Sequence, residues 1–360
     1  MININSFCFG YLGVQKHGYN FITALSHHDD IALFPWDSLP PTDYISPFLQ
    51  QCLLNAQAEA VQQNLGIGIG VMNRMPHIVG NKKIAFTVWE TSKIPAPELA
   101  YLTDVDEIWV PSTWGKTVLE NNGIPAVRIQ VVPEGVDTML YCPQPANPKA
   151  FSNRRFRFLC VGKWEKRKGL DILLQAFANE FSPDESVELV VHCHNSRIPN
   201  LGTKIKSEIA QLNLPPHAPL RYSSPVPEPA MVELYNSCDA FVLPSRAEGW
   251  GLPIIEAMAC AKPVIVTNHS AYLDFVNLHN GYLVNVKKMV KVEDPDCFTP
   301  DLDYGEWAEP DGEHLQYILR DVFEHPDKAK QIGQVAREDV SRAWTWDHAA
   351  TKAWQHIQPC

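Results

Sequence analysis

Two glutamates, Glu248 and Glu256, stand with seven residues between them in the stretch SRAEGWGLPIIEAMACAKPVIVT. The Gly-Trp-Gly-Leu-Pro bend between them predicts the start of a helix, because proline is favoured in a first helical turn. The first N–H groups of a helix have no partner inside it, so such an end binds anions, above all phosphate. Carboxylates beside it suit the hydroxyl groups of a ribose or a sugar. Taken singly, the ordinary explanations are favoured: Glu256 as a charge that complements the helix dipole and Glu248 as a loop acid. Together the two glutamates and the bend predict a site for an anion flanked by polyols.

A second cluster carries the opposite charge. Four basic residues occur within six positions after the apolar run FRFLCVG, namely Lys163, Lys166, Arg167 and Lys168. A solvated turn is the ordinary explanation of such a run. In a chain of net charge −11, however, the density is unusual. Two ammonium groups here, those of Lys163 and Lys168, could hold a diphosphate without a metal.

The surrounding pattern predicts the elements that position both clusters. Short apolar, β-branched runs alternate with helical patterns, which is typical of parallel sheets with helical crossovers. Ligands collect at the carboxyl ends of such strands, and both clusters follow a predicted strand. We predict strands at 67–71, 84–89, 107–111 and 128–133, then at 156–162, 187–193, 240–244 and 263–267, with a helix at 170–181.

The chain divides between the two series of strands. Residues 142–155 are rich in Pro and Asn and lack periodicity, so they are the best linker candidate. The sequence therefore predicts two doubly wound α/β domains, at 1–148 and 149–343. The tail 344–360 has apolar residues at helical spacing and three tryptophans, and it predicts a helix that docks on another element.

Composition limits the classes of function. The chain has 360 residues, 45% of them apolar. It has 41 acidic and 30 basic residues, so its overall charge disfavours binding to nucleic acid or anionic lipid. Its nine cysteines form no CxxC pair, so we expect reduced thiols and no zinc site; the histidines at 27–28 and 192–194 also lack metal spacing. No run reaches the roughly 18 apolar residues of a membrane span and no signal peptide is evident, so we expect a cytoplasmic protein, with peripheral membrane association left open. Segment 291–313 holds nine acidic residues and is predicted to be a solvated loop.

The order of these motifs resembles the retaining family 4 glycosyltransferases. The resemblance rests on VGKWEKRKGLDILLQAF and CDAFVLPSRAEGWGLPIIEAMACAKPVIVT, with VVPEGVD and WVPSTWGKTVLENNGI upstream, and it covers most of the chain. It implies the GT-B fold: two Rossmann-like domains that face a cleft, with the first on the acceptor side, the second binding a nucleotide sugar, and the C-terminal helix crossing back to the first.

The resemblance also implies roles for residues. Glu256 would bind the ribose hydroxyls of the donor, Glu248 would lie against the transferred sugar, and Lys163 and Lys168 would hold the diphosphate. Further donor contacts are expected at Gly18, Gly249, Trp250, Gly251 and Leu252. The catalytic residues would be Lys163, Lys168 and Glu248. No metal or other cofactor is expected, and the partners are a nucleoside diphosphate sugar and an unidentified acceptor, which can be a glycan, a lipid-linked glycan or a small molecule.

The predicted reaction is transfer of a hexose-type sugar with retention of configuration. No dedicated carboxylate nucleophile is evident, so a front-face displacement is the favoured hypothesis. The chain departs from the family pattern at four places. Lys163 stands where Arg is more frequent, Glu134 where Asn is common, and Trp89-Glu90 where many relatives carry a histidine. The N-terminal glycine loop is represented only by Gly10, Gly13 and Gly18. We therefore place Trp89 and Glu90 on the acceptor side without a copied catalytic role.

Three other classes of protein share parts of this pattern. A nicotinamide-dependent Rossmann enzyme is disfavoured, because LGIGIGVMN lacks the strand-turn-helix context of a GxGxxG loop and predicts an alternating strand with Ile67, Ile69 and Val71 on one face. A GT-B nucleotide-sugar epimerase and a non-catalytic nucleotide-sugar-binding protein both stay open.

Overall fold

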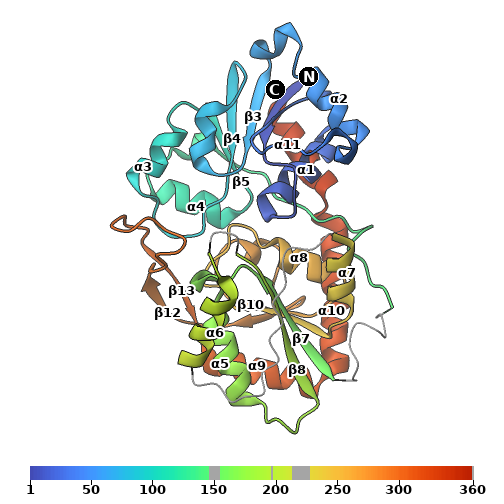
Figure 1. The fold of residues 1–360 in the computed structure, drawn as a ribbon, viewed down its shortest axis with the longest axis vertical. Helices are drawn as coiled ribbons and strands as arrows, with labels where there is room; N and C mark the ends of the chain where they lie inside the picture. The colour runs from blue at the N-terminus through green and yellow to red at the C-terminus, as the bar shows by residue number, and fades with distance from the viewer. Residues whose placement is uncertain (146–154, 196–197, 213–227, 359–360) are drawn as a thin grey trace. The chain divides into compact units, whose positions relative to one another are not determined.

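The computed structural model describes residues 1–145, 155–195, 198–212 and 228–358. These residues form two compact units (Figure 1). Unit 1 comprises residues 1–135 and 344–360, and unit 2 comprises residues 136–343. The division thus falls at Gly135–Val136, before the linker candidate 142–155, most of which lies outside the described residues.

Unit 1 is built on a six-stranded parallel sheet in the order β2-β1-β3-β4-β5-β6. Its strands are β1 (Ile2–Ser6), β2 (Ile31–Pro35), β3 (Leu65–Ile69), β4 (Lys82–Phe86), β5 (Glu107–Val110) and β6 (Ile129–Val131). Four of them match predicted strands. In β3 the alternation holds for Ile67 and Ile69, which are fully buried, but Val71 lies beyond the strand and is exposed.

The helices of unit 1 are α1 (Gly13–Leu25), α2 (Pro47–Asn55), α3 (Ala96–Leu99), α4 (Thr113–Asn121) and α11 (Trp346–Ile357). Helix α11 is the predicted tail helix, and it packs on α1. Trp346 stacks on His17 with ring centroids 5.7 Å apart, and Trp354 stacks on His28 at 5.6 Å. The apolar face of α11 is buried at Ala349, Ala350 and Ala353, which accounts for the helical spacing seen in the sequence.

Unit 2 contains a five-stranded parallel sheet in the order β11-β10-β9-β7-β8. Its strands are β7 (Phe156–Gly162), β8 (Val187–Cys193), β9 (Ala240–Leu243), β10 (Val264–Thr267) and β11 (Tyr282–Val284). The four strands predicted for this unit are confirmed. They are mainly apolar, as buried parallel strands require, and the charged side chains of Arg157 in β7 and Glu188 in β8 pair with each other.

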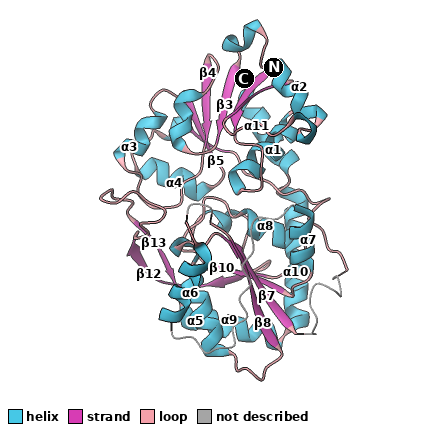
Figure 2. Cartoon of the chain, in the orientation of Figure 1, coloured by secondary structure: helices cyan, strands magenta, loops and turns pink. Residues whose placement is uncertain are grey.

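Helices lie to both sides of this sheet (Figure 2). They are α5 (Leu170–Glu180), α6 (Leu201–Gln211), α7 (Glu228–Asn236), α8 (Leu252–Ala259), α9 (Gly312–Glu324) and α10 (Pro326–Ala343). A separate antiparallel pair joins β12 (Val286–Lys291) to β13 (Glu306–Pro310). This pair corrects the prediction of a solvated loop at 291–313, because Trp307 and Ala308 within it are fully buried.

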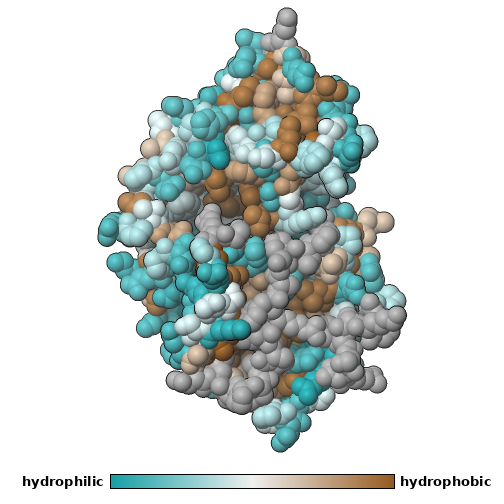
Figure 3. Space-filling view, viewed as in Figure 1, coloured by the Kyte–Doolittle hydropathy of each residue, from teal (hydrophilic) through white to brown (hydrophobic). Residues whose placement is uncertain are grey.

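The face in Figure 3 mixes hydrophilic and hydrophobic residues. None of the described helices combines the length and apolar character that a membrane crossing requires. All eight cysteines among the described residues are free, as predicted, and Cys360 lies outside them.

Candidate active site in the second unit

Two turns meet at one edge of the sheet of unit 2. The basic turn follows β7 and the glutamate bend follows β9, and these strands are neighbours with parallel pairing. Gly169, which ends the basic turn, adopts φ +67°, and a Cβ there would lie 2.1 Å from the carbonyl oxygen of Pro244 at the end of β9. Only glycine allows this approach, so it fixes the two turns side by side.

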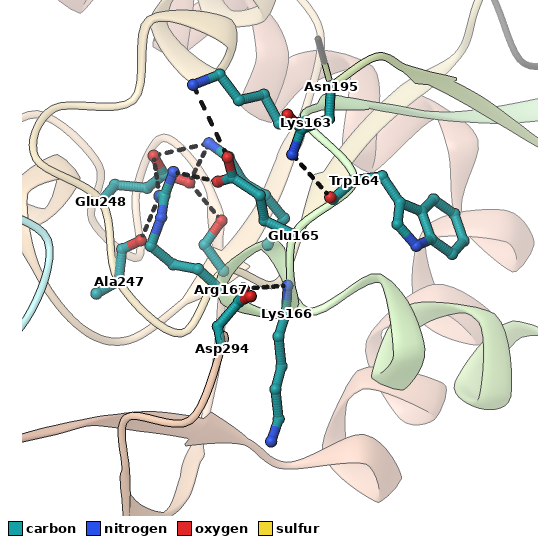
Figure 4. A network of polar contacts seen from close by, with 11 residues as sticks. Lys163, Trp164, Glu165, Lys166, Arg167, Asn195, Ala247, Glu248 and Asp294 are labelled. Carbon is teal, nitrogen blue, oxygen red and sulfur yellow. Dashed lines mark hydrogen bonds and ion pairs between the residues drawn. The ribbon is translucent and has the colours of Figure 1, made fainter. Parts of the chain in front are cut away.

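Glu248 is the centre of the site (Figure 4). It is 4% exposed, and both its oxygens accept hydrogen bonds from Lys168 Nζ, at 2.7 and 2.9 Å. Ser245 Oγ donates to Oε1 at 2.6 Å. Burial alone would raise the pKa of Glu248, but the charges of Lys168 and Arg167 outweigh it and lower this pKa to about 2. The carboxylate is therefore ionised and held in one orientation.

Arg167 lies in the site, although the sequence pattern indicates no role for it beyond its place in the basic run. Its guanidinium is buried and lies 3.0 Å from Glu248 Oε2. It also donates to the carbonyl oxygen of Ala247 at 2.9 Å and to Glu165 Oε2 at 3.1 Å. Glu248 is thus bracketed by two cations, one of which is anchored independently by Glu165 and the bend.

Lys163 differs from Lys168 in its surroundings. Its side chain is 42% exposed, and Nζ lies 3.8 Å from Glu165 Oε1. The charges of Arg167 and Lys168 are balanced by Glu165 and Glu248. Lys163 and Lys166 are thus the accessible cations of this turn, and the side chain of Lys166 points away from Glu248 (Figure 4). The resemblance implies the same role for Lys163 and Lys168. Because their surroundings differ, the two lysines offer an anion different contacts.

The bend itself leads into α8. Gly251 precedes the helix with φ +103°, a conformation that side-chain-bearing residues rarely adopt. No described residue accepts a hydrogen bond from the backbone N–H of Gly251 or Leu252. These groups start an eight-residue helix, which is the geometry of an anion-binding end, and their contact with a diphosphate stays a prediction.

The side chain of Trp250 is buried, whereas its predicted donor contact is through the backbone amide. Its indole ring is 3% exposed and packs on Phe275, with ring centroids 4.8 Å apart. The side chain therefore stiffens the bend from the core side. Contact of Gly249 and Trp250 with a donor through their backbones stays a prediction.

Glu248 also receives support from a strained residue. Ser270, after β10, has φ +75° and accepts a hydrogen bond at its Oγ from the backbone N–H of Glu248 at 3.0 Å. Positive φ at serine costs free energy, and such strain persists where the surroundings enforce it. Nothing in the sequence around Ser270 indicates this conformation.

Glu256 lies in α8 and is 5% exposed. Tyr235, at the end of α7, donates from Oη to Glu256 Oε2 at 2.8 Å. Burial and the charge of Glu256 raise the pKa of Tyr235, so the phenol keeps its proton and stays a donor. The sequence did not point to Tyr235, because nothing local links a tyrosine in one helix to a glutamate in the next.

The predicted site residues of unit 1 lie apart from this cluster in the sequence and are described within their own unit. Gly18 is inside α1, where a Cβ would meet the carbonyl oxygen of Phe7 at 2.1 Å and Ser6 Oγ at 2.2 Å. The structure thus gives Gly18 a packing role, and its contact with a donor stays a prediction. Trp89 Nε1 donates to Thr91 Oγ1 at 2.7 Å, which fixes the loop after β4.

Glu90 in this loop influences a buried carboxyl group after β6. Burial, with a smaller contribution from the charge of Glu90, raises the pKa of Glu134 to about 8. His17 Nδ1 lies 3.4 Å from Glu134 Oε1, and burial lowers the pKa of His17 to about 3. The Glu of VVPEGVD therefore faces a histidine inside unit 1. Among the described residues, no group of three or more His, Cys, Asp or Glu side chains is arranged to hold a metal ion.

Comparison with known proteins agrees with this geometry. Residues 145–293 match the model of the family Glycosyl transferases group 1. The matched segment includes both the basic turn and the glutamate bend, and it covers less than half of the chain.

The curated proteins similar to this chain are distant in sequence. A putative glycosyltransferase 45 of Sulfolobus islandicus filamentous virus is 25% identical over 69% of this chain and 66% of its own length. The mannosylfructose-phosphate synthase of Agrobacterium fabrum is 28% identical over 42% of this chain and 35% of its own length. The matched stretches thus span about one third to two thirds of those relatives.

Solved structures show the fold of the whole chain. Sucrose-phosphate synthase from Thermosynechococcus elongatus superposes with a TM-score of 0.74 at 15% identity, covering 99% of this chain and 97% of that chain. Anabaena HepE, solved in complex with UDP-glucose, gives a TM-score of 0.72 at 15% identity and 99% coverage of both chains. This chain therefore has the GT-B fold, as its sequence predicts.

Proposed function

We propose that this protein transfers a hexose-type sugar from a nucleoside diphosphate sugar to an acceptor, with retention of configuration at the anomeric carbon. The observation that carries the proposal is the ionised, buried Glu248 held by Lys168 and Arg167 beside the start of α8. This arrangement offers cations and N–H groups to a diphosphate and a fixed carboxylate to the hydroxyls of a sugar. A relative of the same fold is solved with UDP-glucose, which makes this donor the first to test.

The residues of unit 2 take separate roles in this proposal. Glu256, oriented by Tyr235, binds the ribose hydroxyls. Lys168 uses two of its three N–H donors on Glu248, so the third can reach an oxygen of the diphosphate. Lys163 supplies the accessible positive charge that attracts the diphosphate to the turn.

The chemistry that follows is the departure of the nucleoside diphosphate. As the glycosidic bond breaks, negative charge grows on the leaving oxygens, and Lys168 and the amides of Gly251 and Leu252 stabilise it. Groups fixed before the reaction lower the barrier more than they stabilise the bound donor, and one such donor group contributes about 3 kcal/mol. No carboxylate is assigned as a nucleophile, so the acceptor attacks from the face that the diphosphate leaves. Unit 1, with Trp89 and Glu90, is assigned to the acceptor.

The experiment that tests the proposal is a panel of UDP-, GDP- and ADP-sugars assayed for release of the nucleoside diphosphate. Slow attack by water reveals the accepted donor even when the acceptor is unknown. We expect one donor to be hydrolysed, the released sugar to keep its anomeric configuration, and the rate to survive EDTA because cations and helix N–H groups replace a metal. A rate that EDTA abolishes and Mn²⁺ restores would contradict metal independence. Return of an epimeric nucleotide sugar would indicate an epimerase, and binding without turnover a non-catalytic binding protein.

A further inference from the structure

The acidic segment 291–313 contacts the basic turn directly. Asp294 is 6% exposed, and its Oδ2 accepts a hydrogen bond from the backbone N–H of Lys166 at 3.0 Å (Figure 4). Asp294 is held in turn, since its Oδ1 accepts from the N–H of Asp296 at 3.2 Å and its carbonyl oxygen from the N–H of Phe298 at 2.9 Å. A buried carboxylate with this many fixed bonds is unlike a solvated loop acid.

Arg246 forms a second link between the acidic segment and the basic turn. Its side chain is 2% exposed and donates from Nε to Glu309 Oε2 in β13 at 2.6 Å. Its two terminal nitrogens bind Asp171 in α5, at 3.0 and 2.8 Å, and Nη1 also donates to the carbonyl oxygen of Lys166. Planar, two-pronged contacts of this kind fix geometry as well as charge.

The backbone of Arg246 also links the acidic segment to the basic turn. Its N–H donates to the carbonyl oxygen of Arg167 at 2.7 Å, and its carbonyl oxygen accepts from the N–H of Ala308 at 3.1 Å. Hydrogen bonds thus run from β13 through Arg246 to the basic turn. Because the positive charge of Arg246 faces the carboxylates of Asp171 and Glu309, the residue joins elements and does not present its charge to an anion.

The turn needs such external bonds. Residues Lys166–Lys168 form a three-residue 3₁₀-helix, closed by the bonds Lys168 N–H to Glu165 oxygen at 3.0 Å and Gly169 N–H to Lys166 oxygen at 3.1 Å. So short a helix has too few internal hydrogen bonds to repay the cost of ordering it. Both cations that bracket Glu248 sit on this element.

We propose that the acidic segment positions the basic turn for the donor diphosphate, with Asp294, Arg246 and Glu309 as positioning residues. This rests on the proposed function for the identity of the anion, but the positioning itself is a property of the ligand-free protein. Most of the nine acidic residues of the segment are solvated. Asp294 and Glu309 instead hold the basic turn in position.

The experiment compares Asp294→Ala and Glu309→Ala with the full-length wild-type protein by amide hydrogen exchange and by calorimetry with UDP, GDP and ADP. We expect exchange at the Lys166–Gly169 amides to rise at least about tenfold, with strands β7 to β10 unchanged, and nucleoside diphosphate affinity to fall about tenfold. Asp294→Asn and Glu309→Gln keep an acceptor oxygen and should restore most of both properties. Glu293→Gln removes an exposed charge one residue away and is the matched control.

Each result decides between the alternatives. Wild-type exchange in the turn of Asp294→Ala and Glu309→Ala would overturn the proposal, as would an equal effect of Glu293→Gln. Faster exchange throughout the sheet would show that the residues stabilise unit 2 as a whole and do not position the turn. If the wild-type protein binds none of the three nucleotides, the proposed function fails, and the exchange of the Asp294→Asn and Asp294→Ala pair still decides the positioning role.

Discussion

Lys168 and Glu248 are 80 positions apart in the sequence, yet Lys168 Nζ binds both carboxylate oxygens of Glu248, at 2.7 and 2.9 Å. One residue comes from the turn after β7 and the other from the bend after β9. In this contact a cation for the diphosphate and an anion for the sugar are neighbours before any donor arrives. Before the donor binds, the pair therefore fixes one group for the diphosphate and one for the sugar of the proposed donor.

The two lysines of the basic turn should differ when each is replaced by methionine. Lys168→Met removes a fixed, buried ammonium, so we expect donor hydrolysis to slow about 100-fold. Lys163→Met removes a half-exposed charge, so we expect only a few-fold loss of nucleoside diphosphate affinity and a smaller loss of rate. Steady-state kinetics and calorimetry measure both. Equal losses in the two variants would show that the different surroundings of the lysines have no functional consequence.

The stability of the protein in acid should report the charge of Glu248. The pKa of this group in the folded protein is about 2, below its ordinary 4.5, because Lys168 and Arg167 outweigh the effect of burial. A group whose pKa is lowered by folding contributes its full stability at pH values above its ordinary pKa. This stability is lost as the pH falls through the pKa of the group in the folded protein. We expect wild type to exceed Glu248→Gln in unfolding free energy at about pH 6, and the difference to shrink toward pH 3. Urea unfolding at several pH values measures it; a difference independent of pH would contradict the charged pair.

The two glutamates should separate in nucleotide binding. Glu256→Gln should weaken binding of the free nucleoside diphosphate, because its proposed partner is the ribose. Tyr235→Phe should do so by about 1 kcal/mol, since the carboxylate loses a buried hydrogen bond. Glu248→Gln should spare this affinity while depressing transfer. Calorimetry on the folded variants measures the nucleotide affinity of all three. Equal weakening by Glu248→Gln and Glu256→Gln would contradict the assigned roles.

The sequence predicted those parts of the fold that local pattern determines. Strands β7 to β10 are mainly apolar runs, and α11 has a regular apolar face. Strand β1 was missed because its alternating residues Asn3 and Asn5 look solvent-facing, although both are buried. Asn3 compensates with bonds from Nδ2 to the carbonyl oxygens of Val61 and Val79. Burial of this kind depends on partners far along the chain.

The same limit applies to the site. Glu248 and Lys168 were recognised because charge and glycine spacing mark them locally. The contacts of Tyr235, Ser270 and Asp294 join elements whose distance in space no local pattern reveals. Of these, Asp294 shows the limit most clearly, since its eight acidic neighbours in 291–313 conceal one buried carboxylate.

The C-terminal helix offers the last test. Helix α11 belongs to unit 1, where Trp346 is 7% exposed and stacks on His17, and a Cβ on Gly135 would lie 2.4 Å from the backbone nitrogen of Trp346. Removing residues 344–360 therefore exposes the core of unit 1, and Trp346→Ala alone should cost it about 3 to 5 kcal/mol.

If unit 1 receives the acceptor and unit 2 binds the donor, these changes should act on transfer and not on nucleotide affinity. We expect transfer to be largely lost in the truncated protein and reduced in Trp346→Ala, while calorimetric affinity for the nucleoside diphosphate stays within about threefold, since no donor contact is removed. Trp354→Ala, at a half-buried position on the same helix, is the matched control and should have a smaller effect. Full transfer by the truncated, folded protein would contradict the division of labour, and so would a nucleotide affinity that collapses together with the rate.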